Sequence, residues 1–223
     1  MALKENVAIL VWGLYAGGAE RIAGLLSIYL SEHYNVFLFV GEEGTEVYDY
    51  RGTLINVDIN GADYREEQVA LAKKKYGINY SISFLDDMNF INIRTKGDDY
   101  VIVSNRCTLS YFATPRWSSQ YEMRKFFNHA DAVVSVSKGV TYEMVNQYDV
   151  KPEKITTIYN FIDKEKVRRL SGAGETLKDK NNWVMVNIGR IDEQKRHEII
   201  VLSGLKNIDN ISNKDLLEID YSE

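Results

Sequence analysis

Two stretches of the sequence combine glycines or cations with a strand-to-helix junction, an arrangement that can bind an anionic ligand. The first is GLYAGGAER (13–21), which follows the apolar run VAILVW and precedes a helical pattern. Glycines there let the backbone approach a ligand, and the helix N-terminus offers free N–H groups with a partial positive charge. Gly17 and Gly18 fit that role. A tight turn followed by solvated Glu20 and Arg21 is the alternative interpretation.

The second stretch is NIGRIDEQKR (187–196), where an apolar run ends at Gly189. Arg190 and Lys195 flank a short polar turn before the next helical pattern. Two cations placed in this way can hold a diphosphate beside a helix N-terminus. A solvated surface loop is the alternative, because isolated surface charges are common.

A third candidate, VSNRCTL (103–109), ends another apolar run. Asn105 and Arg106 are expected to project at the end of that strand. The planar guanidinium of arginine can hold an anionic or hydroxyl-rich ligand; a solvated strand end is the alternative. The adjacent Cys107 has no assignable base and is more typical of a small buried side chain than of a nucleophile.

These residues need a scaffold, and the pattern of apolar runs indicates one. Short β-branched runs alternate with helical patterns such as AERIAGLLSIYLSEH (19–33). Continuous apolar strands separated by helices predict an α/β fold, a doubly wound parallel sheet covered on both faces. Ligands bind outside the carboxyl ends of the strands in such sheets. The expected strands are 7–12, 36–40, 54–59, 80–85, 100–104, 132–137 and 154–160.

After residue 160 the sequence becomes charged and loses most of its apolar periodicity. We expect a Rossmann-like domain over 1–160 and a charged linker or hinge over 161–182. WVMVNIG (183–189) predicts a further buried strand, with a helix after it. A βαβ unit needs about 30 residues, so 183–223 holds an incomplete second α/β unit.

Composition excludes several classes. The chain has 223 residues and a net charge of -5, so nucleic acid is not expected as a partner. It has no apolar stretch of about 18 residues, the length of a transmembrane helix. Its single cysteine rules out an intrachain disulfide, and we expect a cytoplasmic location.

Two standard nucleotide motifs and a metal site are also missing from the sequence. There is no G-x-x-x-x-G-K-[ST], and the glycines at 13, 17 and 18 do not form G-x-G-x-x-G. Glu42 could otherwise resemble the ribose-binding acid of a dinucleotide site. The three histidines lack metal-ligand spacing.

Taken together, these motifs resemble the retaining family 4 (group 1) glycosyltransferases of GT-B architecture, of the bacterial type that builds surface polysaccharides or lipid-linked glycans. The resemblance runs from Val7 to about Val201. It rests on GGAER, FLDDMNF, VIVSNR, ADAVVSVSKGV…KITTIYNFID and NIGRIDEQKRHEII in this order. It implies a hexosyltransferase that moves a sugar, with retention, from a nucleotide-sugar such as a UDP-sugar to a glycan or lipid-linked acceptor.

The resemblance also implies roles for individual residues. The N-terminal domain would hold the acceptor, and no metal or other cofactor is expected, because fixed cations and helix dipoles would stabilise the leaving nucleoside diphosphate. The donor diphosphate would be bound by Gly17, Gly18, Arg190 and Lys195. The acceptor side would include Glu20, Arg21, Asn105 and Arg106.

The sequence departs from the family in two places. Arg196 replaces the family's glycine after the lysine, and the Glu-containing motif of the second domain has no match. The interpretations left open are a shortened expression product, a frameshifted or split gene product, or half of a two-chain enzyme. A non-catalytic acceptor- or partner-binding fragment is the alternative function, and a dinucleotide oxidoreductase is a more distant one.

Two partner predictions follow from surface features. The unpaired edge of strand 183–189 favours a homodimer or a complementing chain. The small basic clusters 73–75 and 163–170, together with a lipid-linked acceptor, indicate peripheral contact with the inner face of the membrane. Solvated helix faces are the alternative interpretation of these clusters.

Overall fold

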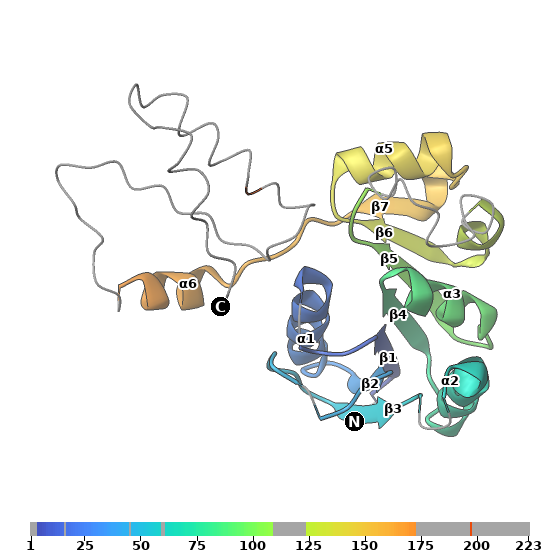
Figure 1. The fold of residues 1–223 in the computed structure, drawn as a ribbon, viewed down its shortest axis with the longest axis horizontal. Helices are drawn as coiled ribbons and strands as arrows, with labels where there is room; N and C mark the ends of the chain where they lie inside the picture. Colours follow the sequence, from blue (N-terminus) through green and yellow to red (C-terminus); the bar gives the residue numbers. More distant parts are fainter. Residues whose placement is uncertain are drawn as a thin grey trace, which may run out of the picture. The chain divides into compact units, whose positions relative to one another are not determined.

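The chain contains a parallel seven-stranded sheet flanked by helices (Figure 1). It divides into two compact units, Met1–Asp163 and Lys164–Glu223, and the sheet belongs to the first. The strand predicted at 183–189 lies outside the described residues, and the predicted domain boundaries stay a prediction. The computed structural model describes residues 4–15, 17–44, 46–58, 61–108, 124–172 and 197.

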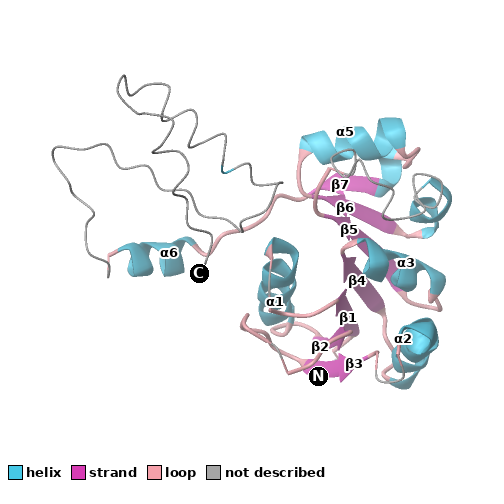
Figure 2. Cartoon of the chain, in the orientation of Figure 1, coloured by secondary structure: helices cyan, strands magenta, loops and turns pink. Residues whose placement is uncertain are grey.

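The sheet has the order β3-β2-β1-β4-β5-β6-β7, and every neighbouring pair is parallel (Figure 2). The doubly wound α/β prediction is therefore confirmed. All seven expected strands are present: β1 (Asn6–Val11), β2 (Asn35–Val40), β3 (Thr53–Asn56), β4 (Tyr80–Phe84), β5 (Tyr100–Asn105), β6 (Ala132–Ser135) and β7 (Ile155–Thr157).

Five α-helices and three short 3₁₀ turns accompany the strands in the described part of the chain. Residues 124–126 are also helical and run directly into the 3₁₀ turn Phe127–His129. The helices are α1 (Gly18–Leu30), α2 (Arg65–Lys75), α3 (Asp86–Arg94), α5 (Lys138–Gln147) and α6 (Lys164–Ser171). The 3₁₀ turns are η1 (Ala62–Tyr64), η2 (Phe127–His129) and η3 (Pro152–Lys154).

Alternation along β1 explains why helices cover both faces of the sheet. Successive strand side chains point to opposite faces. Ile9 and Val11 pack in a cluster with buried residues of α1, whereas Ala8 and Leu10 pack with residues of α2 and α3. These four side chains are fully buried. A strand buried on both sides must be apolar throughout, which is the pattern of VAILV.

Three predicted strands end two or three residues earlier in the structure than in the sequence analysis. β6 ends at Ser135 because Ser137 is the N-cap of α5, where its Oγ accepts a hydrogen bond from the Val140 N–H at 3.2 Å. β3 ends at Asn56, whose side chain accepts from the Asp58 N–H at 2.8 Å and so turns the chain. β7 is shortened to three residues. Side-chain hydrogen bonds of Ser and Asn stop strands in this way.

The strand order places a topological switch point between β1 and β4. From β1 the chain builds outward through β2 to β3, and then it returns to the other side of β1 to form β4. The loops that leave the carboxyl ends of β1 and β4 therefore diverge. In open α/β sheets this divergence creates the crevice where ligands bind.

A buried ion pair ties α2 to the sheet. Lys73 Nζ lies 2.9 Å from Asp99 Oδ2, and both side chains are almost inaccessible to solvent. Ser81 Oγ donates to the same carboxylate at 2.5 Å. Burial lowers the pKa of Lys73, and the charge of Asp99 partly offsets that effect. Lys73 thus belongs to the core, so it is not part of the exposed basic cluster that residues 73–75 were expected to form at a membrane surface or on a solvated helix face.

Candidate functional site

The turn between β1 and α1 requires glycine at position 17 for steric reasons. Gly17 is the N-cap of α1 and has φ +90°, a backbone region that L-residues rarely adopt. A Cβ at this position would lie 2.6 Å from Glu20 Oε2. A Cβ on Gly18 would meet no atom within 4 Å, so this side of the turn is open.

The N-terminus of α1 has no side-chain cap, because Gly17 has no side chain. The first N–H groups of an uncapped helix have no intrahelical acceptor and carry the positive end of the helix dipole. Glu20 stands in this first turn, and Arg21 is exposed. This turn lies at the carboxyl end of β1, beside the switch point, and can therefore receive an anion.

Tyr15 links the turn to the end of β2. Its hydroxyl hydrogen-bonds to the carboxylate of Glu42, which follows β2. Partial burial raises the pKa of Tyr15, and the charges of Glu42 and Glu20 raise it further. Glu42 therefore interacts with the turn itself, which gives it a structural contact in place of the ribose contact considered from the sequence.

Arg65 contributes a stacked and paired guanidinium on the β1–β3 side of the same edge. Its Cζ lies 4.5 Å from the centroid of the Trp12 ring. Its Nε and Nη2 both lie close to Asp58 Oδ1, at 3.0 and 2.9 Å. Burial raises the pKa of Asp87, and the charge of Arg65 lowers it in part. The charge of Arg65 is thus compensated within the protein.

Arg106 occupies the other side of the switch point, directly after β5. Its Cζ lies 5.4 Å from the centroid of the Phe84 ring, at the end of β4. One Nη donates to Ser104 Oγ at 3.3 Å, and the other donates to Asn160 Oδ1, which follows β7. Burial lowers the pKa of the guanidinium. Among the described residues, no carboxylate forms an ion pair with Arg106.

Asn105, the other acceptor-side candidate on β5, faces the interior. Its side chain is buried, and its amide lies 2.9 Å from Met144 Sδ on α5. Its Oδ1 accepts the Cys107 N–H at 3.4 Å. This geometry assigns Asn105 a packing contact; its acceptor-side role stays a prediction.

The structure therefore places one group of the predicted residues at the carboxyl edge of the sheet. The glycine turn follows β1 and Arg106 follows β5, with β4 between them. Arg190 and Lys195 lie outside the described residues.

Two residues at this edge were not predicted from the sequence. Leu85 is the N-cap of α3 with φ +71°, and nothing in its sequence context predicts a positive φ. Phe84 was missed because its residue type in an apolar run predicts only a core position.

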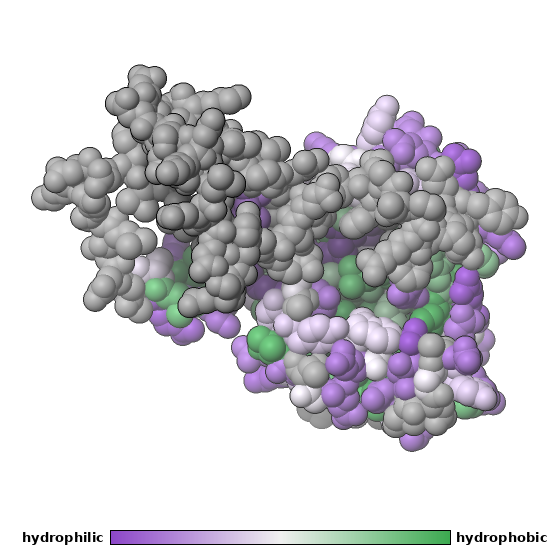
Figure 3. Space-filling model, in the orientation of Figure 1, coloured by the Kyte–Doolittle hydropathy of each residue, from purple (hydrophilic) through white to green (hydrophobic). Residues whose placement is uncertain are grey.

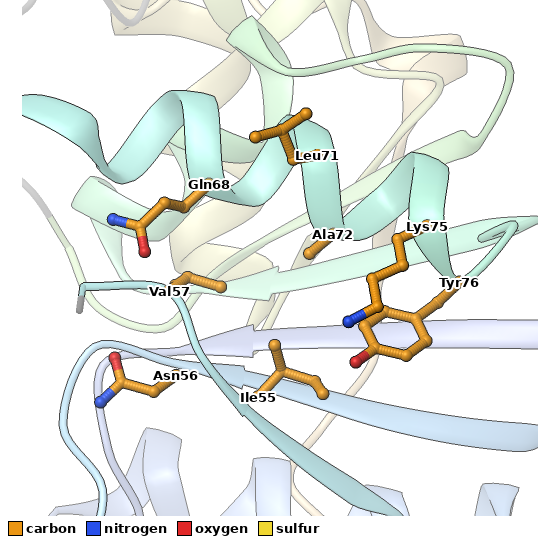
Figure 4. Close-up of a pocket in the computed structure, with 8 residues that line it drawn as sticks. All are labelled: Ile55, Asn56, Val57, Gln68, Leu71, Ala72, Lys75 and Tyr76. Carbon is orange, nitrogen blue, oxygen red and sulfur yellow. The ribbon is translucent and has the colours of Figure 1, made fainter. Parts of the chain in front are cut away.

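A separate pocket of about 340 Å³ lies between edge strand β3 and α2 (Figure 4). Its walls are mainly apolar. One buried donor in it, Gln68 Nε2, has no hydrogen-bond partner among the residues that the structure describes. The lining residues are Ile55, Asn56, Val57, Gln68, Leu71, Ala72, Lys75 and Tyr76.

Two properties of the described residues concern metals and membranes. No group of three or more His, Cys, Asp or Glu side chains there could hold a metal ion. None of the helices described has the length and apolar character needed to cross a bilayer.

A protein-family model matches the part of the chain that forms β5 to β7 and contains Arg106 and Asn160. Residues 101–166 match Glycosyltransferase Family 4. This family 4 region starts within β5 and ends in α6. The expected resemblance to family 4 is therefore supported over this region.

A curated relative extends the similarity along most of the chain. It is the N-acetylgalactosamine-N,N'-diacetylbacillosaminyl-diphospho-undecaprenol 4-alpha-N-acetylgalactosaminyltransferase of Campylobacter jejuni. The two sequences are 25% identical over 217 residues, which cover 88% of this chain and 58% of the relative. The chain thus spans less than two thirds of the relative's length.

Solved structures share the fold. HepE from Anabaena, solved with UDP and glucose, superposes with a TM-score of 0.53 at 14% identity, over 75% of this chain and 50% of its own. Sucrose-phosphate synthase from Thermosynechococcus elongatus superposes with a TM-score of 0.53 at 10% identity, over 77% and 53%. Both confirm the Rossmann-like fold, and the chain spans about half the length of each.

Proposed function

We propose that this chain is the acceptor-side part of a retaining glycosyltransferase. The enzyme would transfer a hexose from a nucleotide-sugar, such as a UDP-sugar, to a glycan or lipid-linked acceptor in surface polysaccharide biosynthesis. The observation that carries the proposal is the match of residues 101–166 to Glycosyltransferase Family 4. The Campylobacter relative supports a lipid-linked acceptor, because its name specifies a diphospho-undecaprenol substrate.

The geometry of the carboxyl edge is compatible with transfer between two anionic substrates. The uncapped N-terminus of α1 at Gly17 and Gly18 provides backbone donors for the donor diphosphate. Arg190 and Lys195 would complete this diphosphate site. Fixed cations and helix dipoles of this kind stabilise the charge that develops on a leaving diphosphate, so we propose that transfer needs no metal.

A transfer assay tests the proposal directly. The chain is incubated with UDP-sugars and a polyprenyl-diphosphate-linked saccharide, and both the extended glycan and the released UDP are measured. We expect transfer that persists in EDTA and a product with the donor's anomeric configuration, determined by NMR. Hydrolysis or transfer of no nucleotide-sugar, with or without a complementing chain, would refute the enzyme proposal.

A second candidate is a non-catalytic fragment that binds an acceptor or a partner chain. The observation that favours it is the edge that holds the glycine turn and Arg106, which can bind an anionic ligand without any donor chemistry. Calorimetric titration with UDP separates the two candidates. Binding of UDP that Arg190→Ala abolishes favours the enzyme. No binding at millimolar UDP favours the fragment. If UDP then binds only in a homodimer or with a complementing chain, the assembly supplies the donor site.

We further propose that the protein works in the cytoplasm, at the membrane surface where lipid-linked acceptors are found. Hydrophilic residues dominate the described surface on the face shown in Figure 3. On α6, Val167 and Leu170 are exposed next to Arg168 and Arg169, a composition that suits an anionic lipid surface. Flotation with anionic liposomes at low salt tests this; protein that stays at the bottom of the gradient would contradict it.

A further inference from the structure

Arg106 is a partly buried cation whose charge the described residues do not neutralise. Its two hydrogen bonds go to neutral acceptors, the hydroxyl of Ser104 and the amide of Asn160. No ion pair with Arg106 is formed within the described part of the chain. A desolvated charge without a counter-ion is unfavourable. A bound anion would supply the missing counter-charge.

The guanidinium is also held in a fixed orientation. A guanidinium has five N–H donors, and the two bonds above leave the Nε–H and one N–H on each Nη without a described acceptor. Its face lies over the Phe84 ring. Contacts on the face and on both Nη atoms restrict rotation, so the remaining donors are preorganised for oxyanion binding.

The end of β5, directly before Arg106, is itself held by the buried side-chain amide of Asn89. Asn89 on α3 donates to the Ser104 carbonyl at 3.1 Å, and its Oδ1 accepts from the Ser104 N–H at 3.3 Å. Ser83 Oγ donates to the same Oδ1 at 2.8 Å. Asn89 is fully buried. The end of β5 is thus clamped from α3, which limits movement of the adjacent Arg106.

From these contacts we infer that Arg106 binds a phosphate group of the acceptor substrate. The side chain lies at the carboxyl end of β5, where β4 separates it from the glycine turn at β1. The turn and the cations of 187–196 are proposed to bind the donor diphosphate, so Arg106 is available for a second anion. This inference rests on the proposed glycosyltransferase function, and it defines the acceptor as a phosphorylated one.

The first test compares two acceptors that differ only in phosphate: a polyprenyl-diphosphate-linked saccharide and the same saccharide as an alkyl glycoside. For Arg106→Gln we expect the KM of the diphosphate acceptor to rise about 10- to 100-fold, the range for charge-assisted hydrogen bonds. The donor KM and the use of the alkyl glycoside should not change. Arg106→Lys should recover part of the loss, because it restores the charge without the fork.

Arg94→Gln is the matched control. Arg94 also lies over aromatic rings, with its Cζ 5.7 Å from the Phe90 centroid and 5.1 Å from that of Phe126. It differs from Arg106 in having an ion pair, with Glu66 at 2.9 Å. Its acceptor KM should equal that of the unmodified chain. An equal effect of Arg106→Gln on both acceptors, an effect on the donor KM alone, or no effect would overturn the inference.

A second test separates this inference from the proposed function. If no variant transfers sugar, the proposed function fails, and calorimetric titration with inorganic pyrophosphate then tests the anion site. Binding that weakens at least 10-fold in Arg106→Gln and is retained in Arg94→Gln would support Arg106 as an oxyanion site. Absent binding, or equal binding in all variants, would overturn it. Circular dichroism spectra and unfolding midpoints of each variant ensure that only folded protein is compared.

Discussion

Lys73 and Arg106 are two cations in the same unit, one buried and one partly buried, and they differ in whether a carboxylate of the described residues neutralises them. Lys73 has a carboxylate, Asp99, at 2.9 Å and donates to backbone carbonyls of Asn92 and Thr95. Arg106 has only neutral partners among the described residues. The first arrangement is what a fold requires of a buried charge. The second is typical of a site whose counter-ion comes with a ligand.

The largest effect on stability is expected when the carboxylate that pairs with Lys73 is removed. Asp99→Ala leaves the Lys73 ammonium buried without a counter-ion, and such a loss costs about 3–5 kcal/mol. Urea unfolding at neutral pH measures the change in the free energy of unfolding. The double variant Lys73→Met, Asp99→Ala should recover a large part of the loss, because no charge is left buried. A loss below about 1 kcal/mol would mean that the pair is not a core element.

The next effect concerns the turn opposite Arg106. Gly17→Ala places a Cβ at φ +90° and 2.6 Å from Glu20 Oε2, so we expect destabilisation of about 1–3 kcal/mol. Gly18→Ala is the control, since its Cβ meets no atom within 4 Å. Its free energy of unfolding should stay within about 1 kcal/mol of the parent. Equal effects of the two substitutions would contradict the described turn.

A smaller effect is expected for the partly exposed ion pair between Lys96 and Asp131 at the amino end of the sheet. Burial tends to raise the pKa of Asp131, but the hydrogen bonds from Lys96 and the Val101 N–H and the nearby positive charges together lower it. A lowered carboxyl pKa adds stability above the unfolded-state value of about 4, and this is lost as the pH falls through the folded-state pKa. Asp131→Asn should therefore cost about 1 kcal/mol or less at pH 7.

Unfolding midpoints at pH 7 and pH 3 measure this difference. The gap between Asp131→Asn and the parent should narrow at pH 3, because the unfolded chain binds a proton at Asp131 below its unfolded-state pKa of about 4. A gap that is constant across this range would show that the hydrogen bonds, and not the charge, account for the effect.

The smallest effect on stability is expected at Arg106. Arg106→Gln removes a partly desolvated charge that has no described counter-ion, so the free energy of unfolding should change by less than about 1 kcal/mol in either direction. Urea unfolding measures it beside Asp99→Ala. A loss as large as that of Asp99→Ala would mean that Arg106 is a structural cation, and the contrast between the two residues would disappear.

Local patterns predicted the fold well. VAILV and VFLFV are apolar throughout, VIVS is apolar up to its final serine, and all three lie in strands within the sheet. Helix boundaries have local signals of the same kind, a serine at the N-terminus of one helix and a glycine after the C-terminus of another. Ser137 caps α5, and Gly77 follows α2 with φ +53°. These features depend on residues within a few positions of one another, so a single sequence contains the needed information.

The candidate site was predicted only in part. The glycine turn and Arg106 were identified from residue type and position at strand ends, and the parallel sheet brings both to one edge. The buried orientation of Asn105 was not predicted, because it depends on Met144 of α5. The donor-side predictions for Arg190 and Lys195 fall on residues outside the described part of the chain.

The amino-acid sequence by itself determined the alternation of strands and helices and the position of the glycine turn, because hydrophobic periodicity and glycine chemistry act locally. Only the tertiary structure decided which charges are paired. Lys73 of α2 meets Asp99 just before β5, and Arg106 meets Phe84 and Asn160 from β4 and from the end of β7. Parallel strands joined by crossover helices bring together residues far apart in sequence, so partners such as these have no local signature.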